Sequence, residues 1–372
     1  MTQGVAMRSC AGDRDPTVLL PRLPLSEIET PALLIDQSTF EANLEAAETM
    51  LRGTGKLLRP HLKTHRTPAL AMWQLGPTAK GVTCATVSEA EAAVEAGIRD
   101  VLVANEIVSR TKICRAVSLA GSARVILAVD ALEPLILICE EAQRAHTSVD
   151  VLVDVDIGLR RCGVKSPAEA RDLALKVSQS KGVRFGGLMG YEGRLRLSVP
   201  NRAERIARGY DLLREAKRKI EDAGLPVEIV SAAGTSTMLE ALRDETITEI
   251  QAGTYALMEP ELLDLGVPFR CAVSILATVI SRGPGRVILD VGRRAAGCEY
   301  GLPVCLSPNA KTEAVHDEHT VLAWEGDLPP LGERVTLRPT QNRTTFNLYD
   351  CIWVIEEDGG TGRKLPTVRE RT

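Results

Sequence analysis

One short segment of the chain concentrates groups that could do nucleophilic and acid–base chemistry. Residues 59–65 (RPHLKTH) follow the apolar run 56–58 and contain Lys63 between two histidines. A lysine becomes a nucleophilic amine when burial or neighbouring positive charge favours its neutral form. His61 and His65 are candidate proton acceptors. A solvated basic loop is the competing explanation, and this segment taken alone favours that explanation.

A second segment has the composition of a phosphate-binding turn. Residues 231–237 (SAAGTST) place Gly234, Thr235 and Ser236 between an apolar run and a helical pattern. Small residues and hydroxyls at such a place expose backbone N–H groups to a phosphate. An ordinary turn with a Ser or Thr cap is at least as common. Residues 253–255 (GTY), which end in Tyr255, follow the next apolar run and could complete the phosphate site.

Two more apolar runs end in polar side chains. Residues 154–163 (DVDIGLRRCG) include Arg161, and residues 190–193 (GYEG) include Tyr191. A lysine at one strand end, a phosphate-binding turn at another and guanidinium groups between them together indicate a phosphorylated aldehyde cofactor. No single segment carries this inference, which depends on their convergence.

The elements that must position these groups alternate between short apolar runs and helical patterns. Residues 32–35 precede the helical pattern 39–51, and residues 81–86 precede 88–96. The other expected strands lie at 56–58, 101–104, 124–129, 149–155, 184–189, 227–230 and 249–255. Apolar strands separated by amphipathic helices predict a closed, parallel (β/α)8 barrel, with an open doubly wound sheet as the alternative. Active sites of such barrels lie at the carboxyl ends of the strands, where the polar segments fall.

The pattern changes in the last third of the chain. Strand-like runs with little helical pattern between them lie at 272–280, 286–289, 319–324, 334–337 and 352–356. They predict a C-terminal all-β domain. We expect an N-terminal segment over 1–27, the barrel over 28–265, the β domain over 266–358 and a loose, charged tail over 359–372.

Composition argues against several classes of function. The 45 basic and 49 acidic residues give a net charge of −4 and are spread along the chain, so we expect no nucleic-acid partner. Nine scattered cysteines without a CxxC pair favour a reduced, cytoplasmic protein. No apolar run approaches the roughly 18 residues of a membrane span, and the first residues lack the apolar stretch of a signal peptide. We therefore expect a soluble protein with no membrane partner.

These segments together resemble the D-threonine aldolase and D-serine dehydratase family, which has the alanine-racemase type of pyridoxal phosphate fold. The resemblance extends over about residues 28–356 in consistent order. It is carried by residues 29–32 (ETPA), 59–65, 156–158 (DIG), 161–164 (RCGV), 190–193, 253–255, 317–319 (DEH) and 347–350 (NLYD). It implies pyridoxal 5'-phosphate as the cofactor, an amino acid as the substrate, a barrel followed by a β domain, and a homodimer that closes the site.

The resemblance also implies roles for individual residues. Lys63 is then the Schiff-base lysine, Arg161 faces the phenolic side of the cofactor, and Tyr191 lies near the Schiff base. Residues that reach the phosphate are Gly234, Thr235 and Tyr255, with Ser236 beside them.

The sequence departs from this family at the expected metal site. Family members bind a divalent metal through a histidine and, two residues later, an aspartate or cysteine, shortly before an Asn-Leu-x-Asp motif. Gln341 and Arg343 occupy these positions in residues 339–348 (PTQNRTTFNL). A guanidinium has no lone pair to donate and an amide is a poor substitute for imidazole, so we expect no divalent metal. Arg194 similarly follows the GYEG segment where metal-dependent relatives commonly carry a histidine.

We expect a pyridoxal phosphate-dependent aldolase or related lyase that acts on a D-configured or α-substituted β-hydroxy amino acid without a metal. Arg194 and Arg343 would bind an anionic substrate group or a developing alkoxide in place of the metal. His61, His65 and His319 are candidate bases, and the sequence leaves open which one acts.

Alternatives to the aldolase stay open. An amino-acid racemase or epimerase would keep the cofactor and move only the α-proton, and the loss of the metal fits it nearly as well. A non-catalytic pyridoxal phosphate-binding protein is disfavoured because such carriers resemble the barrel alone. Dehydration is less favoured because no metal would activate the leaving hydroxyl. A structural or interaction protein would leave the polar strand ends unexplained.

Overall fold

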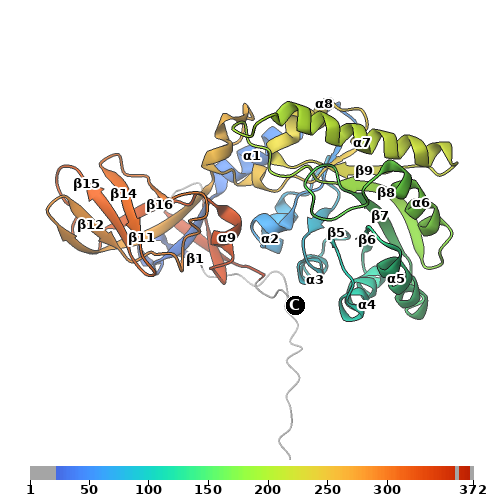
Figure 1. Cartoon of the computed structure of the whole chain (residues 1–372). Coiled ribbons are helices and arrows are strands. Elements are labelled where there is room, and N and C mark those ends of the chain that lie inside the picture. The colour runs from blue at the N-terminus through green and yellow to red at the C-terminus, as the bar shows by residue number, and fades with distance from the viewer. Residues whose placement is uncertain (1–21, 357–359, 369–372) are drawn as a thin grey trace, which may run out of the picture.

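Two sheets organise the residues that the structure describes, 22–356 and 360–368. The computed structural model places an eight-stranded sheet in one domain and a ten-stranded sheet in the other. Figure 1 shows the two domains side by side, with α1 (Gln37–Leu51) between them. The eight-stranded sheet is parallel, and the ten-stranded sheet is mostly antiparallel.

The first sheet forms a parallel barrel. Its strands are β3 (Leu57–Leu58), β4 (Val82–Cys84), β5 (Asp100–Glu106), β6 (Arg124–Val129), β7 (Val149–Val155), β8 (Val183–Gly190), β9 (Ile229–Ala232) and β10 (Glu249–Ile250). Their order is β3-β10-β9-β8-β7-β6-β5-β4. A parallel bridge between His61 and Thr83 joins the segment after β3 to β4 and closes the sheet. The predicted fold class, a parallel barrel followed by a β domain, is confirmed.

Helices connect the barrel strands and cover the outside of the barrel (Figure 1). They are α2 (Pro68–Trp73), α3 (Val87–Glu95), α4 (Arg110–Ser118), α5 (Leu132–Arg144), α6 (Pro167–Ser178), α7 (Arg202–Asp222) and α8 (Met238–Arg243). Local sequence sets where several of them begin. Thr86 Oγ1 accepts a hydrogen bond from the backbone N of Glu89 at the start of α3, and Ser166 Oγ accepts one from Glu169 at the start of α6. These N-caps satisfy backbone donors that a helix start leaves free.

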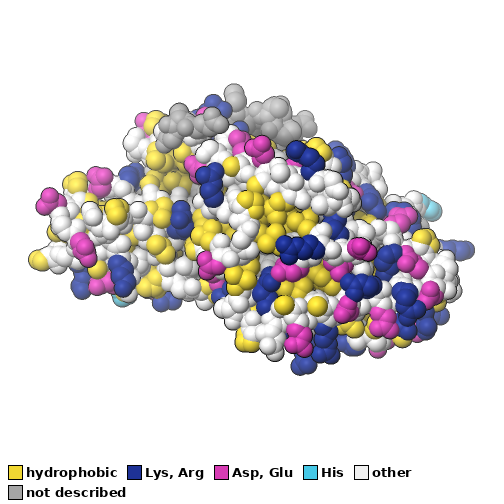
Figure 2. Space-filling view, turned by 90° about the horizontal axis from the view of Figure 1, so that it is seen from above, with side chains coloured by type: hydrophobic (Ala, Val, Ile, Leu, Met, Phe, Trp, Pro, Cys, Tyr) yellow, Lys and Arg dark blue, Asp and Glu magenta, His cyan; other side chains and the backbone are white. Residues whose placement is uncertain are grey.

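The longest helix, α7, has 21 residues and carries ion pairs on its outward face. Lys217 pairs with Glu221, and Arg218 pairs with Asp222 at 2.8 Å. Exposed pairs at this spacing contribute roughly 0.3–0.5 kcal/mol each. Figure 2 shows basic and acidic side chains interspersed over the barrel end of this face, with apolar side chains gathered toward its middle. No helix within the described ranges combines the length and apolar character needed to cross a membrane.

The second sheet is mostly antiparallel and forms the β domain. Its strands are β1 (Arg22–Pro24), β2 (Ala32–Asp36), β11 (Val273–Gly283), β12 (Arg286–Leu289), β13 (Val304–Cys305), β14 (Ala310–Val315), β15 (Thr320–Trp324), β16 (Arg334–Arg338), β17 (Cys351–Ile355) and β18 (Thr361–Pro366). The main path runs β1-β18-β17-β2-β11-β12-β15-β14, and β16 joins it through β11. The parallel pair within it is β17 with β2.

Two segments lie in a different place from the one predicted. Residues 32–35, expected in the barrel, form β2, which pairs with β11 and β17 in the second sheet. All four are buried, so their apolar run suits either sheet equally well. Residues 361–366, expected in a loose tail, form β18 between β1 and β17. The domain limits remain predictions, and the loose ends expected at 1–21 and 369–372 lie outside the described residues.

The β domain reaches the barrel mouth through α9 (Asn342–Phe346). The Nδ2 of Asn342 donates to the carbonyl of Met258 at 2.7 Å. The ring of Phe346 lies 6.5 Å from that of His65, centroid to centroid and edge-on. These contacts bring the residues just before and within α9 to the carboxyl ends of the barrel strands.

Candidate active site

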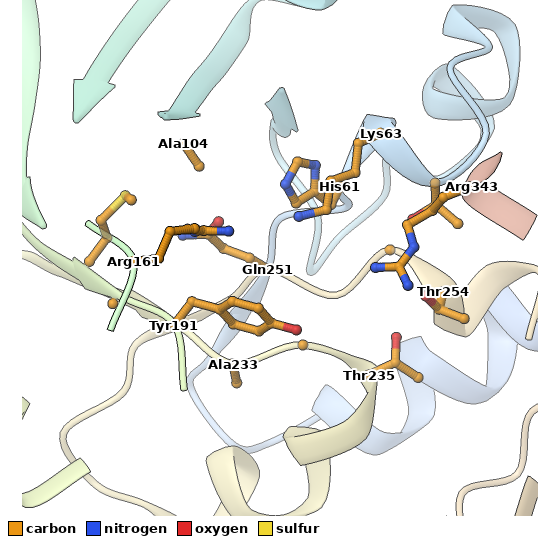
Figure 3. Close-up of a pocket in the computed structure, with 15 residues that line it drawn as sticks. His61, Lys63, Ala104, Arg161, Tyr191, Ala233, Thr235, Gln251, Thr254 and Arg343 are labelled. Carbon is orange, nitrogen blue, oxygen red and sulfur yellow. The ribbon is translucent and has the colours of Figure 1, made fainter. Parts of the chain in front are cut away.

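A cavity with an empty volume of about 600 Å³ opens at the barrel mouth (Figure 3). Residues that line it include His61, Lys63, Thr64, Ala104, Arg161, Met189, Gly190, Tyr191, Ala233, Gly234, Thr235, Gln251, Gly253, Thr254 and Arg343. Three of them, Lys63, Arg161 and Arg343, are cations, and none of the described residues in this lining is a carboxylate. The cavity therefore suits an anionic ligand.

Lys63 lies in the 3₁₀ turn Leu62–Thr64 directly after β3. Burial lowers the pKa of its amine to about 8, and the positive charges of Arg343 and Arg161 act in the same direction. Roughly a tenth of the amine is then neutral at pH 7, far more than for an exposed lysine. The predicted lysine is thus buried in the cavity, and part of its amine is in the neutral, nucleophilic form near neutral pH.

The three candidate histidines have different surroundings. His61 lines the cavity, its Nδ1 has no hydrogen-bond partner among the described residues, and burial lowers its pKa well below the usual value. His65 lies outside the cavity lining: its Nδ1 accepts from the backbone N of Thr67 at 3.1 Å, so its Nε2 donates to Gln74 at 2.9 Å. Burial lowers the pKa of His65 to about 4. His319 is exposed in the β domain. Of the three, His61 alone faces the cavity.

The predicted phosphate turn forms one wall of the cavity. After β9, Ala233 takes a left-handed backbone conformation with φ of 65°, and residues 235–237 continue as a 3₁₀ turn into α8. The Oγ1 of Thr235 is buried and has no hydrogen-bond partner in the described part of the chain. Its side chain points into the cavity beside that of Thr254 (Figure 3). A buried hydroxyl without a partner is costly, which indicates that a ligand completes its hydrogen bonding.

Buried side chains hold this turn from behind. The Oγ1 of Thr237 accepts from the backbone N of Gly234 at 3.2 Å and donates to the carboxyl group of Glu192. Arg202 donates to the carbonyl of Ser236 at 2.5 Å. Burial raises the pKa of Glu192 to about 7. The backbone of the turn is therefore fixed before any ligand binds.

Two residues predicted to bind the phosphate do not line the cavity. Ser236 is 5% exposed and its carbonyl points back toward Arg202. Tyr255 is 1% exposed, and its hydroxyl accepts from Nε2 of Gln74 at 3.1 Å. Thr254, the neighbour of Tyr255, lines the cavity in its place.

Tyr191 and Arg161 follow two neighbouring strands. Tyr191 comes directly after β8, and its ring centroid lies 5.9 Å from Nζ of Lys63. Burial raises the pKa of its hydroxyl to about 12, with a further contribution from Glu192. Arg161 lies in the turn after β7 and lines the side of the cavity where Gln251 lies (Figure 3).

Gln251 is a cavity residue that the sequence did not single out. The Oγ of Ser231 donates to Glu249 at 2.5 Å, because a carboxylate can only accept. The same Oγ accepts a hydrogen bond from Nε2 of Gln251 at 3.0 Å. Glu249 is in turn 2.8 Å from Nε of Arg59 inside the barrel. The amide oxygen of Gln251 is left as an acceptor. Its place directly after β10 is the signal that could have identified it.

Comparison with known proteins agrees with this geometry. Residues 35–259 match the model of the alanine racemase N-terminal domain, and residues 272–355 match that of a serine dehydratase-like domain. The chain belongs to the D-threonine aldolase and D-serine dehydratase family. It is 35% identical to the D-threonine aldolase of Arthrobacter sp over 91% of this chain and 92% of that protein.

Other members of the family are also similar. The 3-hydroxy-D-aspartate aldolase of Paracoccus denitrificans (strain Pd 1222) is 29% identical over 94% of this chain and 93% of its own length. The crystal structure of D-threonine aldolase from Filomicrobium marinum superposes with a TM-score of 0.88 at 35% identity, covering 96% of this chain and 99% of that chain.

Relative to this family, the expected metal position is occupied by a basic side chain. Arg343 lines the cavity and its guanidinium points into it (Figure 3). Gln341 lies behind the lining and is 5% exposed. Within the described ranges, no group of three His, Cys, Asp or Glu side chains has the arrangement of a metal site.

Arg194, predicted to contact the substrate, does not line the cavity. Its Nη2 lies 2.5 Å from Oε2 of the fully buried Glu259, and it also pairs with Glu261. Its guanidinium stacks 5.3 Å from the ring centroid of Tyr300. Carboxylates distant in sequence thus hold Arg194 beside the cavity. The guanidinium of Arg343, in contrast, lies in the cavity lining.

Proposed function

We propose that this chain is a pyridoxal phosphate-dependent lyase of the aldolase type, which cleaves the Cα–Cβ bond of a D-configured or α-substituted β-hydroxy amino acid. The observation that carries the proposal is the presence of a buried lysine of lowered pKa and a phosphate-type turn in the walls of one cavity. The similarity to D-threonine aldolase supports the choice of reaction.

The cavity fits both ends of this cofactor. A phosphate oxygen would satisfy the buried hydroxyl of Thr235, with the backbone of Gly234 and the hydroxyl of Thr254 beside it. At the opposite wall, Lys63 would form the Schiff base and Arg161 would face the phenolic oxygen. When bound, the cofactor supplies an electron sink for the negative charge that develops at Cα.

His61 is the proposed acceptor of the proton on the β-hydroxyl group. Because burial keeps its pKa well below the usual value, its imidazole is neutral at pH 7 and can take a proton. As the Cα–Cβ bond breaks, the hydroxyl oxygen becomes the carbonyl oxygen of the released aldehyde. The amine of Lys63 would be freed when the amino group of the substrate takes its place on the cofactor, and it would then return a proton to Cα, which its lowered pKa allows near neutral pH.

Arg343 is the proposed replacement for the metal. The β-oxygen gains negative charge as it loses its proton, and a guanidinium placed to meet that charge lowers the barrier. The Arg343 side chain enters the cavity from α9, at the sequence position of a metal ligand in the family. We therefore propose that the reaction needs no divalent metal.

Product analysis tests the proposed function. Protein loaded with pyridoxal phosphate is incubated with D-threonine and with α-methylserine, while aldehyde, amino-acid product and the chirality of the remaining substrate are followed together. We expect aldehyde and amino acid in equal amounts, before and after exhaustive chelation. Racemisation of the substrate without release of aldehyde would show that the protein is a racemase and not a lyase. Bound cofactor with neither product would indicate a carrier.

We also propose that the protein is cytoplasmic and forms a homodimer. Its small-molecule ligand is then its amino-acid substrate. The dimer comes from the family resemblance, in which a second copy closes the site. Sedimentation equilibrium of the loaded protein should give twice the chain mass of 40.2 kDa, and a monomer mass would contradict this.

A further inference from the structure

Glu259 lies at the centre of a hydrogen-bond relay beside the cavity. Its side chain is fully buried, and Oε2 is 2.5 Å from Nη2 of Arg194. Its Oε1 accepts from the backbone N of Asn342 at 2.9 Å and from the side-chain amide of Gln341 at 2.8 Å. Both carboxylate oxygens are therefore engaged, and Arg194 balances their charge.

Donor and acceptor chemistry fixes the direction of the Gln341 amide. A carboxylate can only accept, so the nitrogen of this amide is assigned toward Glu259 and its oxygen toward the opposite side. That oxygen accepts from Nη2 of Arg343 at 3.1 Å. Because Gln341 is 5% exposed, little water competes for these bonds. The relay runs in one direction: Arg343 donates to Gln341, which donates to Glu259.

The relay holds a side chain that would otherwise be loosely fixed. Among the described residues, the guanidinium of Arg343 makes a hydrogen bond to Gln341 and to no other acceptor. Its remaining donors point into the cavity (Figure 3), and its positive charge lowers the pKa of Lys63. Ordering a free arginine on ligand binding costs conformational entropy, which a preset orientation reduces.

We propose that Glu259 and Gln341 are positioning residues that hold Arg343 as a preformed binding group for a carboxylate or alkoxide oxygen. The identity of the natural ligand rests on the proposed function, whereas the relay rests on the contacts above. Arg194 then acts on the ligand only through Glu259.

The chain offers a matched control in Glu261. Arg194 pairs with this second carboxylate as well, and Glu261 lies 2.5 Å from Nη1 of Arg196. In the described part of the chain, the Gln341 amide and the Asn342 backbone N bind Glu259 and not Glu261. Glu261→Gln therefore removes a partner of Arg194 and leaves the relay in place.

Malonate binding to the cofactor-loaded protein tests the relay without turnover. Its dissociation constant is measured by titration calorimetry for wild type and variants, with melting temperatures as a check on folding. Arg343→Gln should weaken binding by at least about tenfold, and Glu259→Gln and Gln341→Leu each by about three- to tenfold. Glu261→Gln should stay within about twofold. The Glu259→Gln/Gln341→Leu double variant should lose no more malonate affinity than whichever single variant binds malonate more weakly, because the two residues act in series.

Several results would overturn the relay. They are wild-type affinity in Gln341→Leu, equal losses in Glu259→Gln and Glu261→Gln, or no malonate binding by the wild type. If Glu259→Gln fails to fold, Gln341→Leu carries the test. A protein that binds malonate as expected but releases no aldehyde would refute the proposed function and leave the relay standing.

Discussion

Glu192 should make the stability of this protein depend on pH in a direction that the structure sets. Glu192 is 2% exposed, and its carboxyl group supports the phosphate turn through Thr237. Burial raises its pKa to about 7 from an ordinary 4.5. Because the folded state holds this proton more tightly than the unfolded chain, its stabilising contribution is complete below pH 4.5 and is lost as pH rises to 7. The full loss is about 3 kcal/mol, most of which falls between pH 5 and 8.

Urea unfolding of the wild type and Glu192→Gln at pH 5, 6, 7 and 8 measures this contribution. The glutamine keeps the size of the side chain and an acceptor for Thr237 but does not titrate. Burial also raises the pKa of Asp154 to about 8 and lowers that of His65 to about 4, so the wild-type curve alone is not diagnostic. Both effects cancel in the difference between the two proteins. Parallel curves, with a constant difference from pH 5 to 8, would refute the reasoning.

Four substitutions in the cavity give further predictions. Arg343→Gln should lower kcat by at least about 100-fold, while exhaustive chelation leaves the wild-type rate unchanged; activity lost on chelation and restored by manganese would contradict this. Gly253→Ala places a Cβ 2.3 Å from Oγ1 of Thr64 and should lower melting temperature and cofactor occupancy, whereas Gly234→Ala, with its nearest neighbour at 3.4 Å, should keep both. Equal behaviour of the two alanines would contradict the packing. Thr235→Val should weaken cofactor binding about fivefold in an absorbance titration at unchanged melting temperature, and unchanged affinity would show that this hydroxyl does not meet the phosphate.

Strand ends could be predicted from the sequence because an apolar run followed by polar residues marks where a buried strand stops. The cavity positions of Lys63, Arg161 and Gly234 follow from that rule together with the rule that parallel strands present their carboxyl ends at one mouth. Which strands pair with one another is harder to predict from the sequence. Residues 32–35 are buried on both faces, so nothing in their composition distinguishes the barrel from the β domain.

Contacts between residues distant in sequence account for the rest. His61 and His65 belong to one heptapeptide, but the 3₁₀ turn between them directs the first into the cavity and the second toward Gln74. Arg194 is held by Glu259, 65 residues later, which no local pattern indicates. Such partners are set by the closing of the barrel and the docking of α9.

The central claim is that Lys63 carries pyridoxal phosphate as a Schiff base, and chemical trapping tests it most directly. The protein loaded with pyridoxal phosphate is reduced with borohydride, digested, and mapped by mass spectrometry. We predict one pyridoxyl-phosphate adduct, on the peptide that contains Lys63, and no adduct in a Lys63→Ala control. An adduct on another lysine of the wild type, or the absence of any adduct, would contradict the account.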